Sequence, residues 1–371
     1  MAATREVSEA SELDRRYMAA AIRMSRRNLG LTATNPAVGT LIVRDGAIVG
    51  RGVTAVGGRP HAEPQALAEA GEAARGATAY VTLEPCAHHG RTPPCAEALV
   101  AAGVSRVVGA ATDPDPRVSG RGYAMLRTAG IEVVENVLAA EAADLMAGYL
   151  TRSVRKRPEV ILKLAVSADG MVGRSGEGQV AITGPVSRAQ VHLMRAECDA
   201  ILVGIGTVLA DDPELTCRLP GLGNRSPARI VMDGAARLPL TSRLAQSARV
   251  VPVFLAALPD ANGARRSALE AAGVGFLATE DDDGEVALPE LLDDLAQNGY
   301  ATLMVEGGAK VAQSFIEQDL VDRIALFAGS VSIGKGGVAS PIRPGEVPTT
   351  FERLRADCFG DDRYEEWVRK R

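Results

Sequence analysis

Aromatic residues are scarce in this chain of 371 residues. Phe, Tyr and Trp together make up 4% of it, and only one residue is Trp. Proteins that bind single-stranded nucleic acid use aromatic side chains as platforms on which bases stack. Basic residues are also in deficit, because 41 Lys and Arg stand against 46 Asp and Glu, a net charge of −5. Binding a phosphate backbone needs clustered cations, so the composition predicts no nucleic-acid partner.

Long apolar runs are absent as well. No run is long enough to form a membrane-spanning helix, which takes about 18 or more apolar residues. The segment 1–14 holds no apolar core of a secretory signal, and the five cysteines are an odd number for a disulfide framework. We therefore expect a cytoplasmic protein in a reducing compartment, with no membrane partner.

The length and the apolar pattern predict an α/β protein with two domains. A chain of 371 residues suits two domains at roughly 100–200 residues each. Helical and strand patterns alternate on both sides of the charged segment Arg155-Lys156-Arg157-Pro158, whose proline is incompatible with a helix interior. We place the boundary there, with a first domain over 1–153 and a second over 158–371.

Hydrophobic periodicity predicts the individual elements. In the first domain we expect helices over 13–28, 62–71, 95–102, 120–129 and 139–151, and strands over 38–43, 47–53, 77–83, 106–111 and 131–134. In the second we expect strands over 160–167, 200–203, 229–232, 249–254, 274–277 and 301–305, and helices over 185–196, 263–272, 288–297 and 309–318. The acidic segment 280–284 is expected to be a solvated loop.

Histidine and cysteine, although rare, are concentrated in one part of the chain. His61, Cys86 and Cys95 offer one nitrogen and two thiolates, which leaves the fourth tetrahedral position of a zinc ion open, as in catalytic sites. Glu63 lies two residues beyond His61 and can move a proton from the attacking water to a leaving amine. The pattern His-x-Glu with Pro-Cys is typical of zinc deaminases, although the spacing between the cysteines is wider here.

Two other interpretations of these residues remain open. His88 or His89 could supply a fourth ligand and close a structural zinc site, or the cysteines could be inert buried thiols. Both alternatives leave Glu63 without a role. The remaining candidates, Cys198, Cys217, Cys358 and His192, have no partners at ligand spacing, and we interpret them as structural or surface residues.

The segments around the candidate zinc ligands resemble a known family, the RibD family of bifunctional deaminase/reductases of riboflavin biosynthesis. The resemblance rests on His61-Ala62-Glu63, on Asn35-Pro36-Ala37-Val38-Gly39, and on the run from Thr82 to Cys95, TLEPCAHHGRTPPC. It implies a cytidine-deaminase-like three-layer domain in which His61, Cys86 and Cys95 hold zinc and Glu63 moves protons. It also implies substrate contacts from Asn35, His88, Arg91, Asp113 and Asp115.

The second half contains no complete dinucleotide fingerprint. Gly204-Ile205-Gly206 lacks the third glycine of the Rossmann pattern. Gly307 and Gly308 follow an expected strand and begin an expected helix, which favours a phosphate site. Close packing of the helix on the strand explains such glycines equally well, so the residues alone leave this domain unassigned.

The resemblance extends to the reductase half of the same family. It rests on the segments LKLA at 162–165, SADG at 167–170, LMRA at 193–196, DAILVGIGTVLADDP at 199–213 and EGG at 306–308. It implies a dihydrofolate-reductase-like α/β domain that uses NADPH to reduce the ribosyl group of the deaminated pyrimidine to ribityl. The implied substrate contacts are Lys163, Gly178, Arg195, Leu215, Arg218 and Glu306. The implied cofactor contacts are Ala165, Val180, Thr207, Asp211, Gly308, Ala309, Lys310, Val311, Ala312, Gln313 and Ser314.

The leading hypothesis is therefore a two-step enzyme that uses Zn²⁺ and NADPH on small phosphorylated pyrimidines. Its first step deaminates 2,5-diamino-6-(5-phosphoribosylamino)pyrimidin-4(3H)-one, and its second yields 5-amino-6-(5-phosphoribitylamino)uracil. The family resemblance also implies a homo-oligomer, with a dimer through the reductase domain. A second hypothesis keeps only the deaminase and makes the second domain a non-reducing binding module, because Val180-Ala181-Ile182-Thr183 stands where the family commonly has Trp-Ile-Thr.

Overall fold

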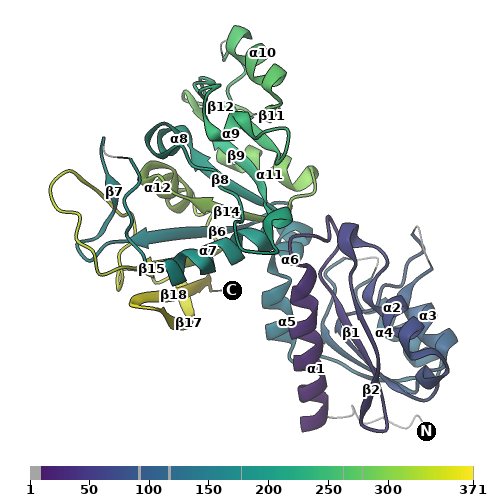
Figure 1. The fold of residues 1–371 in the computed structure, drawn as a ribbon. Coiled ribbons are helices and arrows are strands. Elements are labelled where there is room, and N and C mark those ends of the chain that lie inside the picture. Colours follow the sequence, from purple (N-terminus) through teal and green to yellow (C-terminus); the bar gives the residue numbers. More distant parts are fainter. Residues whose placement is uncertain are drawn as a thin grey trace. The chain divides into compact units, whose positions relative to one another are not determined.

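The computed structural model describes residues 10–90, 93–115, 118–176, 178–261, 263–277 and 279–370. The chain forms two compact units, Met1–Arg155 and Lys156–Arg371 (Figure 1). The division falls inside the charged segment that the sequence marks as a linker. In the described residues, no helix is long and apolar enough to cross a membrane.

The first unit is a five-stranded sheet with helices on both faces. The strand order is β2-β1-β3-β4-β5, in which β1 is antiparallel to β2 and β3, while β3, β4 and β5 are parallel. Figure 1 shows α1 and α5 on one face of the sheet and α2, α3 and α4 on the other. The strands are β1 (Gly39–Arg44), β2 (Ala47–Val53), β3 (Thr78–Leu83), β4 (Arg106–Ala111) and β5 (Glu132–Val134). The helices are α1 (Glu12–Ser25), α2 (Ala62–Ala70), α3 (Cys95–Ala102), α4 (Arg121–Thr128), α5 (Ala139–Leu145) and α6 (Ala147–Arg155), with short 3₁₀ turns η1 (Arg26–Asn28), η2 (Val56–Gly58) and η3 (Gly71–Ala74).

Two glycines of β2 allow α2 to pack close against the sheet. A Cβ atom on Gly52 would lie 1.9 Å from the carbonyl oxygen of Ala62, and one on Gly50 would lie 2.1 Å from that of Ala66. Such distances are far below van der Waals contact, so only glycine permits this approach. The first turn of α2 is therefore held against β2, and this turn carries Glu63.

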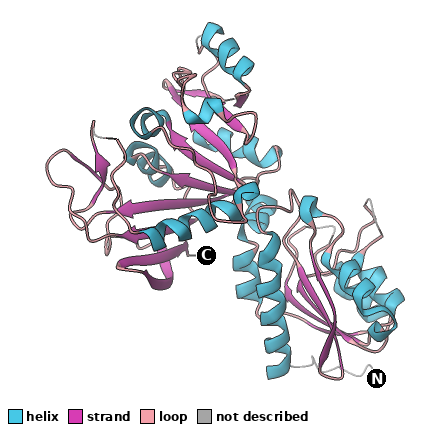
Figure 2. Cartoon of the chain, in the orientation of Figure 1, coloured by secondary structure: helices cyan, strands magenta, loops and turns pink. Residues whose placement is uncertain are grey.

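The second unit is built on a nine-stranded sheet of order β11-β10-β9-β8-β14-β6-β15-β18-β17. The strands from β11 to β15 in this order are parallel, and β18 and β17 add an antiparallel edge (Figure 2). The strands are β6 (Glu159–Val166), β7 (Met171–Arg174), β8 (Ala200–Gly204), β9 (Ala228–Met232), β10 (Val253–Ala256), β11 (Gly275–Leu277), β12 (Asp281–Asp282), β13 (Glu285–Val286), β14 (Thr302–Glu306), β15 (Arg323–Ala328), β16 (Gly337–Ala339), β17 (Phe351–Phe359) and β18 (Asp362–Arg369). The helices are α7 (Pro185–Glu197), α8 (Ile205–Asp211), η4 (Gly223–Arg225), α9 (Arg243–Gln246), α10 (Gly263–Ala272), α11 (Leu288–Gln297) and α12 (Ala309–Glu317).

Three sequence-based expectations about elements need correction. The helix expected over 139–151 is two helices, because Met146 leaves helical geometry at φ −102° and ψ 19°. The strand expected over 249–254 begins only at Val253, since Pro252 has no N–H to donate and residues 250–251 turn back onto Ser247. The acidic segment 280–284 contains β12, which pairs with β13 in a small exposed hairpin.

Candidate active sites

The three predicted zinc ligands lie together in the first unit. His61 is the N-cap of α2, Cys95 is the first residue of α3, and Cys86 follows β3. Their ligand atoms all lie within 4.8 Å of one another. Nδ1 of His61 is 3.3 Å from Sγ of Cys95 and 3.8 Å from Sγ of Cys86.

These separations fit a tetrahedral metal site. Zn–S bonds of about 2.3 Å and Zn–N bonds of about 2.0–2.1 Å place sulfur and nitrogen about 3.6 Å apart around a tetrahedral ion. The two observed distances lie on either side of that value. The Nε2 atom of His61 is buried and has no hydrogen-bond partner, and within the described ranges His61, Cys86 and Cys95 are the one group of three or more residues that could hold a metal ion.

The electrostatics of the cluster favour a thiolate at Cys86. A hydrogen bond from the Cys95 thiol outweighs burial and lowers the pKa of Cys86 to about 4. The backbone N–H of Cys95 also donates to Sγ of Cys86 at 3.3 Å. Burial and the nearby Cys86 raise the pKa of Glu63, which is 4% exposed. A buried carboxyl with a raised pKa can carry a proton near neutral pH, as a general acid requires.

A fourth protein ligand is not found in the described part of this site. The exposed ring of His89 lies 3.0 Å from a carboxylate oxygen of Glu97 instead. His88 is half-buried and does not belong to the metal-capable group. Three ligands leave an open position, which distinguishes a catalytic from a structural zinc site.

Asn35 and Asp113, both predicted to contact the deaminase substrate, are held in defined positions. Gly58 lies three residues before His61. A Cβ atom on Gly58 would lie 2.3 Å from Nδ2 of Asn35, so the absence of a side chain at Gly58 makes room for the Asn35 amide. Asp113 is buried and accepts hydrogen bonds from the backbone N–H of Asp115 at 2.9 Å and from the hydroxyl of Tyr149 at 3.2 Å. Asp115 is half-buried, and Arg91 lies outside the described residues. Tyr149, on α6, carries no motif, and the sequence analysis did not identify it.

The second unit contains a cleft of about 1350 Å³. Its described lining lies between residues 163 and 338, wholly within this unit. The lining includes every predicted substrate residue of the reductase, Lys163, Gly178, Arg195, Leu215, Arg218 and Glu306. It also includes nine of the predicted cofactor residues, Ala165, Val180, Thr207, Asp211, Gly308, Ala309, Lys310, Val311 and Ser314.

Ala312 and Gln313 do not belong to this lining. Ala312 is 1% exposed and lies on the face of α12 that packs against the hydrophobic core. The amide of Gln313 donates to Glu317 on the exposed face of the same helix at 2.7 Å. A helix presents only one face to a cleft, which separates these two residues from Lys310, Val311 and Ser314.

A buried ion cluster forms the floor of the cleft. Arg195 of α7 donates to both carboxylate oxygens of Glu306 at 2.8 Å, and Nζ of Lys163 lies 3.8 Å from the same carboxylate. Burial alone would raise the pKa of Glu306, but the neighbouring Arg195 and Lys163 outweigh it and hold that pKa at about 2. Burial lowers the pKa of Lys163, so its ammonium gives up a proton more readily than a solvated lysine does.

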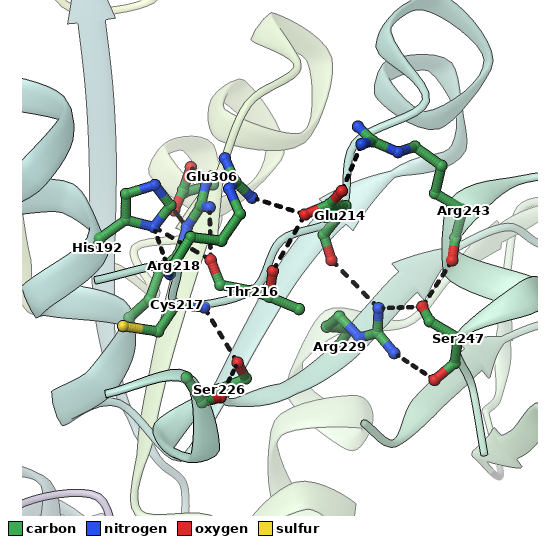
Figure 3. Close-up of polar contacts among 12 residues, drawn as sticks. His192, Glu214, Thr216, Cys217, Arg218, Ser226, Arg229, Arg243, Ser247 and Glu306 are labelled. Carbon is green, nitrogen blue, oxygen red and sulfur yellow. Dashed lines mark hydrogen bonds and ion pairs between the residues drawn. The ribbon is translucent and has the colours of Figure 1, made fainter. Parts of the chain in front are cut away.

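One wall of the cleft is the segment 212–218, between α8 and η4. The carbonyl oxygen of Thr216 accepts a hydrogen bond from Nη1 of Arg195 at 3.2 Å and lies 3.1 Å from Nδ1 of His192 (Figure 3). His192 lines the cleft, so interpreting it as only a structural or surface residue was incomplete. Burial and the nearby Arg195 lower the pKa of His192, which favours the neutral imidazole.

The start of α12 has the features of a phosphate-binding turn. Gly307 and Gly308 follow β14 with φ of 78° and 75°, which non-glycine residues rarely adopt. A Cβ atom on Gly308 would lie 3.2 Å from Oγ1 of Thr207. This cradle beside a helix N-terminus fits the phosphates of a dinucleotide.

Comparison with known proteins gives the same two halves. Residues 158–362 match the family model described as the RibD C-terminal domain, and residues 11–111 match that of the cytidine and deoxycytidylate deaminase zinc-binding region. The chain is 38% identical to the riboflavin biosynthesis protein RibD of Aquifex aeolicus, over 95% of this chain and 97% of the relative. It is 40% identical to RibD of Escherichia coli, over 86% and 89% of the two chains.

Solved structures show the same fold. RibD of Acinetobacter baumannii superposes with a TM-score of 0.84 and 36% identity, covering 97% of this chain and 99% of the other. A diaminohydroxyphosphoribosylaminopyrimidine deaminase/5-amino-6-(5-phosphoribosylamino)uracil reductase from Thermotoga maritima gives 0.83 and 32%, covering 96% and 99%. The expected α/β fold of both halves is confirmed, and so is the reductase identity of the second half, so a non-reducing module is not favoured.

Proposed function

The chain belongs to the RibD family of bifunctional riboflavin-biosynthesis enzymes, and from the geometry of its two sites we propose how its residues divide the chemistry. The enzyme is a zinc-dependent deaminase and an NADPH-dependent reductase. We assign deamination of the phosphoribosylated diaminopyrimidine to the first unit and reduction of the deaminated product to the second. The observation that carries the assignment is the presence, in separate units, of a three-ligand metal cluster with a buried acid and a cleft floored by Lys163, Arg195 and Glu306.

In the deaminase site, His61, Cys86 and Cys95 would hold zinc. Zinc in such a site lowers the pKa of a water molecule, which makes hydrolysis possible at neutral pH. Glu63 accepts a proton from the attacking water and returns it to the departing amino group, so that water adds to the amino-bearing carbon, the C–N bond breaks and ammonia leaves. Its burial and raised pKa suit both halves of this transfer.

Substrate recognition in this site is assigned to polar groups around the metal cluster. The amide of Asn35 can donate to and accept from the edge of a pyrimidine. The carboxylate of Asp113, already fixed by Tyr149 and by the backbone of Asp115, keeps acceptor capacity for sugar hydroxyls. His88 and Arg91 complete the proposed set from the loop between Cys86 and Cys95.

In the reductase site, NADPH supplies the hydride that reduces C1′ of the ribosyl group. Gly308 and the first turn of α12 would hold its phosphates, with Thr207 beside Gly308, and Thr207 and Asp211 also line the cleft. The hydride reaches C1′ when the ribose ring has opened to an imine, and the imine nitrogen takes up a proton. Nζ of Lys163 lies 3.8 Å from the carboxylate of Glu306, and we place this pair beside the imine. Lys163, with its lowered pKa, is the proposed donor of that proton, and Glu306 orients it.

A crossed experiment tests this division. Ammonia release from the diaminopyrimidine and NADPH oxidation on the separately prepared deaminated product are measured for the same two variants. Glu63→Gln should lower ammonia release by at least about 100-fold, the usual weight of a general acid–base group, and leave NADPH oxidation unchanged. Glu306→Gln should do the reverse. If either variant impaired both steps equally, or neither step, the assignment would be wrong.

We propose in addition that the enzyme is a cytoplasmic homo-oligomer associated through the reductase unit. All five cysteines are free, which suits a reducing compartment. The edge strand β17 carries exposed residues on both faces, Leu354 at 46% among them, and an unpaired strand edge is a template for association. Sedimentation of the full chain tests this: a monomer at micromolar concentration would exclude it.

A further inference from the structure

Glu214, in the segment 212–218, stands between two arginines. It lies next to the cleft residues Pro213 and Leu215 and is not itself part of the described cleft lining. One carboxylate oxygen lies 3.2 Å from Nη1 of Arg218, and the other pairs with Nη2 of Arg243 (Figure 3). Arg218 lines the cleft, whereas Arg243, the first residue of α9, is not part of its described lining. Glu214 therefore joins a guanidinium at the cleft to one that does not line it.

Two arginines hold the main chain around Glu214 by donating hydrogen bonds to its carbonyl oxygens. Arg229 of β9 is completely buried, and its Nη1 donates to the carbonyl oxygen of Glu214 at 3.2 Å and to the hydroxyl of Ser247 at 2.8 Å (Figure 3). Two residues further along, Arg195 holds the carbonyl of Thr216 at 3.2 Å. Because the backbone is tied on both sides of Leu215, the Glu214 carboxylate can change partners only by rotation of its own side chain.

The charges of these three side chains bear on phosphate binding. The substrate carries a phosphate monoester with a charge of about −1.5 to −2 at neutral pH. A carboxylate 3.2 Å from Arg218 competes with that phosphate for the guanidinium and repels it. Two guanidiniums around one carboxylate leave a net charge of +1, whereas Arg218 and Glu214 alone would sum to zero.

We propose that Arg243 is a positioning residue for the phosphate end of the reductase substrate: by engaging Glu214, it frees Arg218 to bind the phosphate. The proposal rests on the assignment of Arg218 as a substrate residue in the proposed function. Arg243 itself does not touch the substrate, and its effect passes through Glu214.

A purely structural role for the Arg243 side chain predicts a different result. The backbone N–H of Arg243 donates to Oδ1 of Asp212 at 2.9 Å, and the Ser242 hydroxyl accepts from the N–H of Ala245. The first contact ties α9 to the segment 212–218, the second caps α9, and both survive any change of the Arg243 side chain. A loss of structure would weaken NADPH binding together with substrate binding, and removal of the Glu214 charge would not repair it.

The test is a double-mutant cycle on reductase kinetics with the full chain. The KM for 5-amino-6-(5-phosphoribosylamino)uracil is measured at saturating NADPH for Arg243→Gln, Glu214→Gln and the double variant. We expect Arg243→Gln to raise KM about five- to tenfold, a typical coupling within a charge network, with kcat and the Kd for NADPH unchanged. Glu214→Gln should not raise KM, and the double variant should return KM to the Glu214→Gln value. Inorganic phosphate, used as a competitive inhibitor, should show a parallel weakening in Arg243→Gln alone.

Controls separate this proposal from the assignment on which it rests. Arg266→Gln removes another, half-exposed arginine of the same unit, which pairs with Glu270 at 3.2 Å and lies over the Phe276 ring outside the cleft lining, and it should leave KM unchanged. Suppose that Arg218→Ala raises KM, but the KM of the double variant is the product of the fold-changes of Arg243→Gln and Glu214→Gln. The positioning role of Arg243 is then overturned, and the substrate role of Arg218 stands. If Arg218→Ala leaves KM unchanged, the assignment of Arg218 fails, and the proposal with it. A change in the Kd for NADPH equal to that in KM would identify the cofactor phosphates as the affected ligand and would also overturn the proposal.

Discussion

Arg195 and Glu306 form a bidentate ion pair at the floor of the reductase cleft, with both N···O distances at 2.8 Å and both side chains almost completely buried. The two residues are 111 positions apart and come from α7 and β14. A planar guanidinium facing a carboxylate fixes the orientation of both groups. The pair therefore holds in place the carboxylate that adjoins Lys163.

Breaking this pair should destabilise the reductase unit. Arg195→Met leaves Glu306 buried with only Lys163 at 3.8 Å, and an uncompensated buried charge costs about 3–5 kcal/mol. The single Trp of the chain, Trp367, lies in β18, so its fluorescence reports urea unfolding of this unit alone. Arg266→Met, which breaks an exposed pair, should cost no more than about 1 kcal/mol. Equal losses in the two variants would contradict this prediction.

Stability of the same unit should fall in acid because of Glu306. Its folded-state pKa of about 2 lies below the value of about 4.3 expected in an unfolded chain, so the folded state binds fewer protons. The stabilisation is complete above about pH 4.3 and is lost as pH falls toward 2, a difference of up to about 3 kcal/mol. Urea midpoints followed by Trp367 fluorescence from pH 6.5 to 2.5 should fall more steeply in the wild type than in Glu306→Gln. Parallel curves would show that other groups cause the acid sensitivity.

Removal of zinc should inactivate one activity only. Dialysis against dipicolinate should abolish ammonia release, because His61, Cys86 and Cys95 supply the metal ligands, and the cleft in the other unit contains none of them. NADPH oxidation on the deaminated product should stay within about twofold, a change of under 1 kcal/mol. Zn²⁺ should restore ammonia release and Mg²⁺ should not, since thiolate ligands favour zinc. Loss of both activities on chelation would argue against independent sites.

Gly52→Ala should impair the deaminase, although Gly52 is not itself a proposed site residue. The added methyl group would meet the Ala62 carbonyl at 1.9 Å and push α2, with Glu63, away from the sheet. We expect a loss of about 1–3 kcal/mol in stability of the first unit from overpacking and lower zinc content by metal analysis. Gly223→Ala, in the second unit, where a Cβ atom meets nothing within 4 Å, should leave the stability of the first unit and the zinc content unchanged. Full zinc content in Gly52→Ala would show that α2 can shift without disturbing the site.

The sequence predicted the metal cluster because its three ligands are rare residue types close together in the chain. It also predicted the elements around them, since amphipathic patterns and Gly-containing turns are local signals. Tyr149 could not be found in this way, because its contact with Asp113 joins residues 36 positions apart through two ordinary side chains. The same holds for Arg229, whose partners at Glu214 and Ser247 are defined only by the fold.

The edge of the second sheet was unpredictable for a different reason. The residues of β15 are buried except at the strand's end and form a short apolar run, which periodicity alone does not distinguish from a helix segment. β17 is mostly exposed and polar on both faces, so it lacks the alternation of a half-buried strand. β15 is defined by pairing with β6 and β18, which lie elsewhere in the chain, whereas β17 is defined only by its hairpin with β18.

The division of the chain at residues 155–156 has a consequence for inheritance. The metal ligands lie between residues 61 and 95, and the described lining of the cleft lies between 163 and 338, so each half carries its own site residues. A gene cut at this point would yield two messages, each encoding the described site residues that we assign to one of the two steps. What fusion adds is stoichiometry and a raised local concentration of the intermediate, and selection on those properties can change without altering either chemistry.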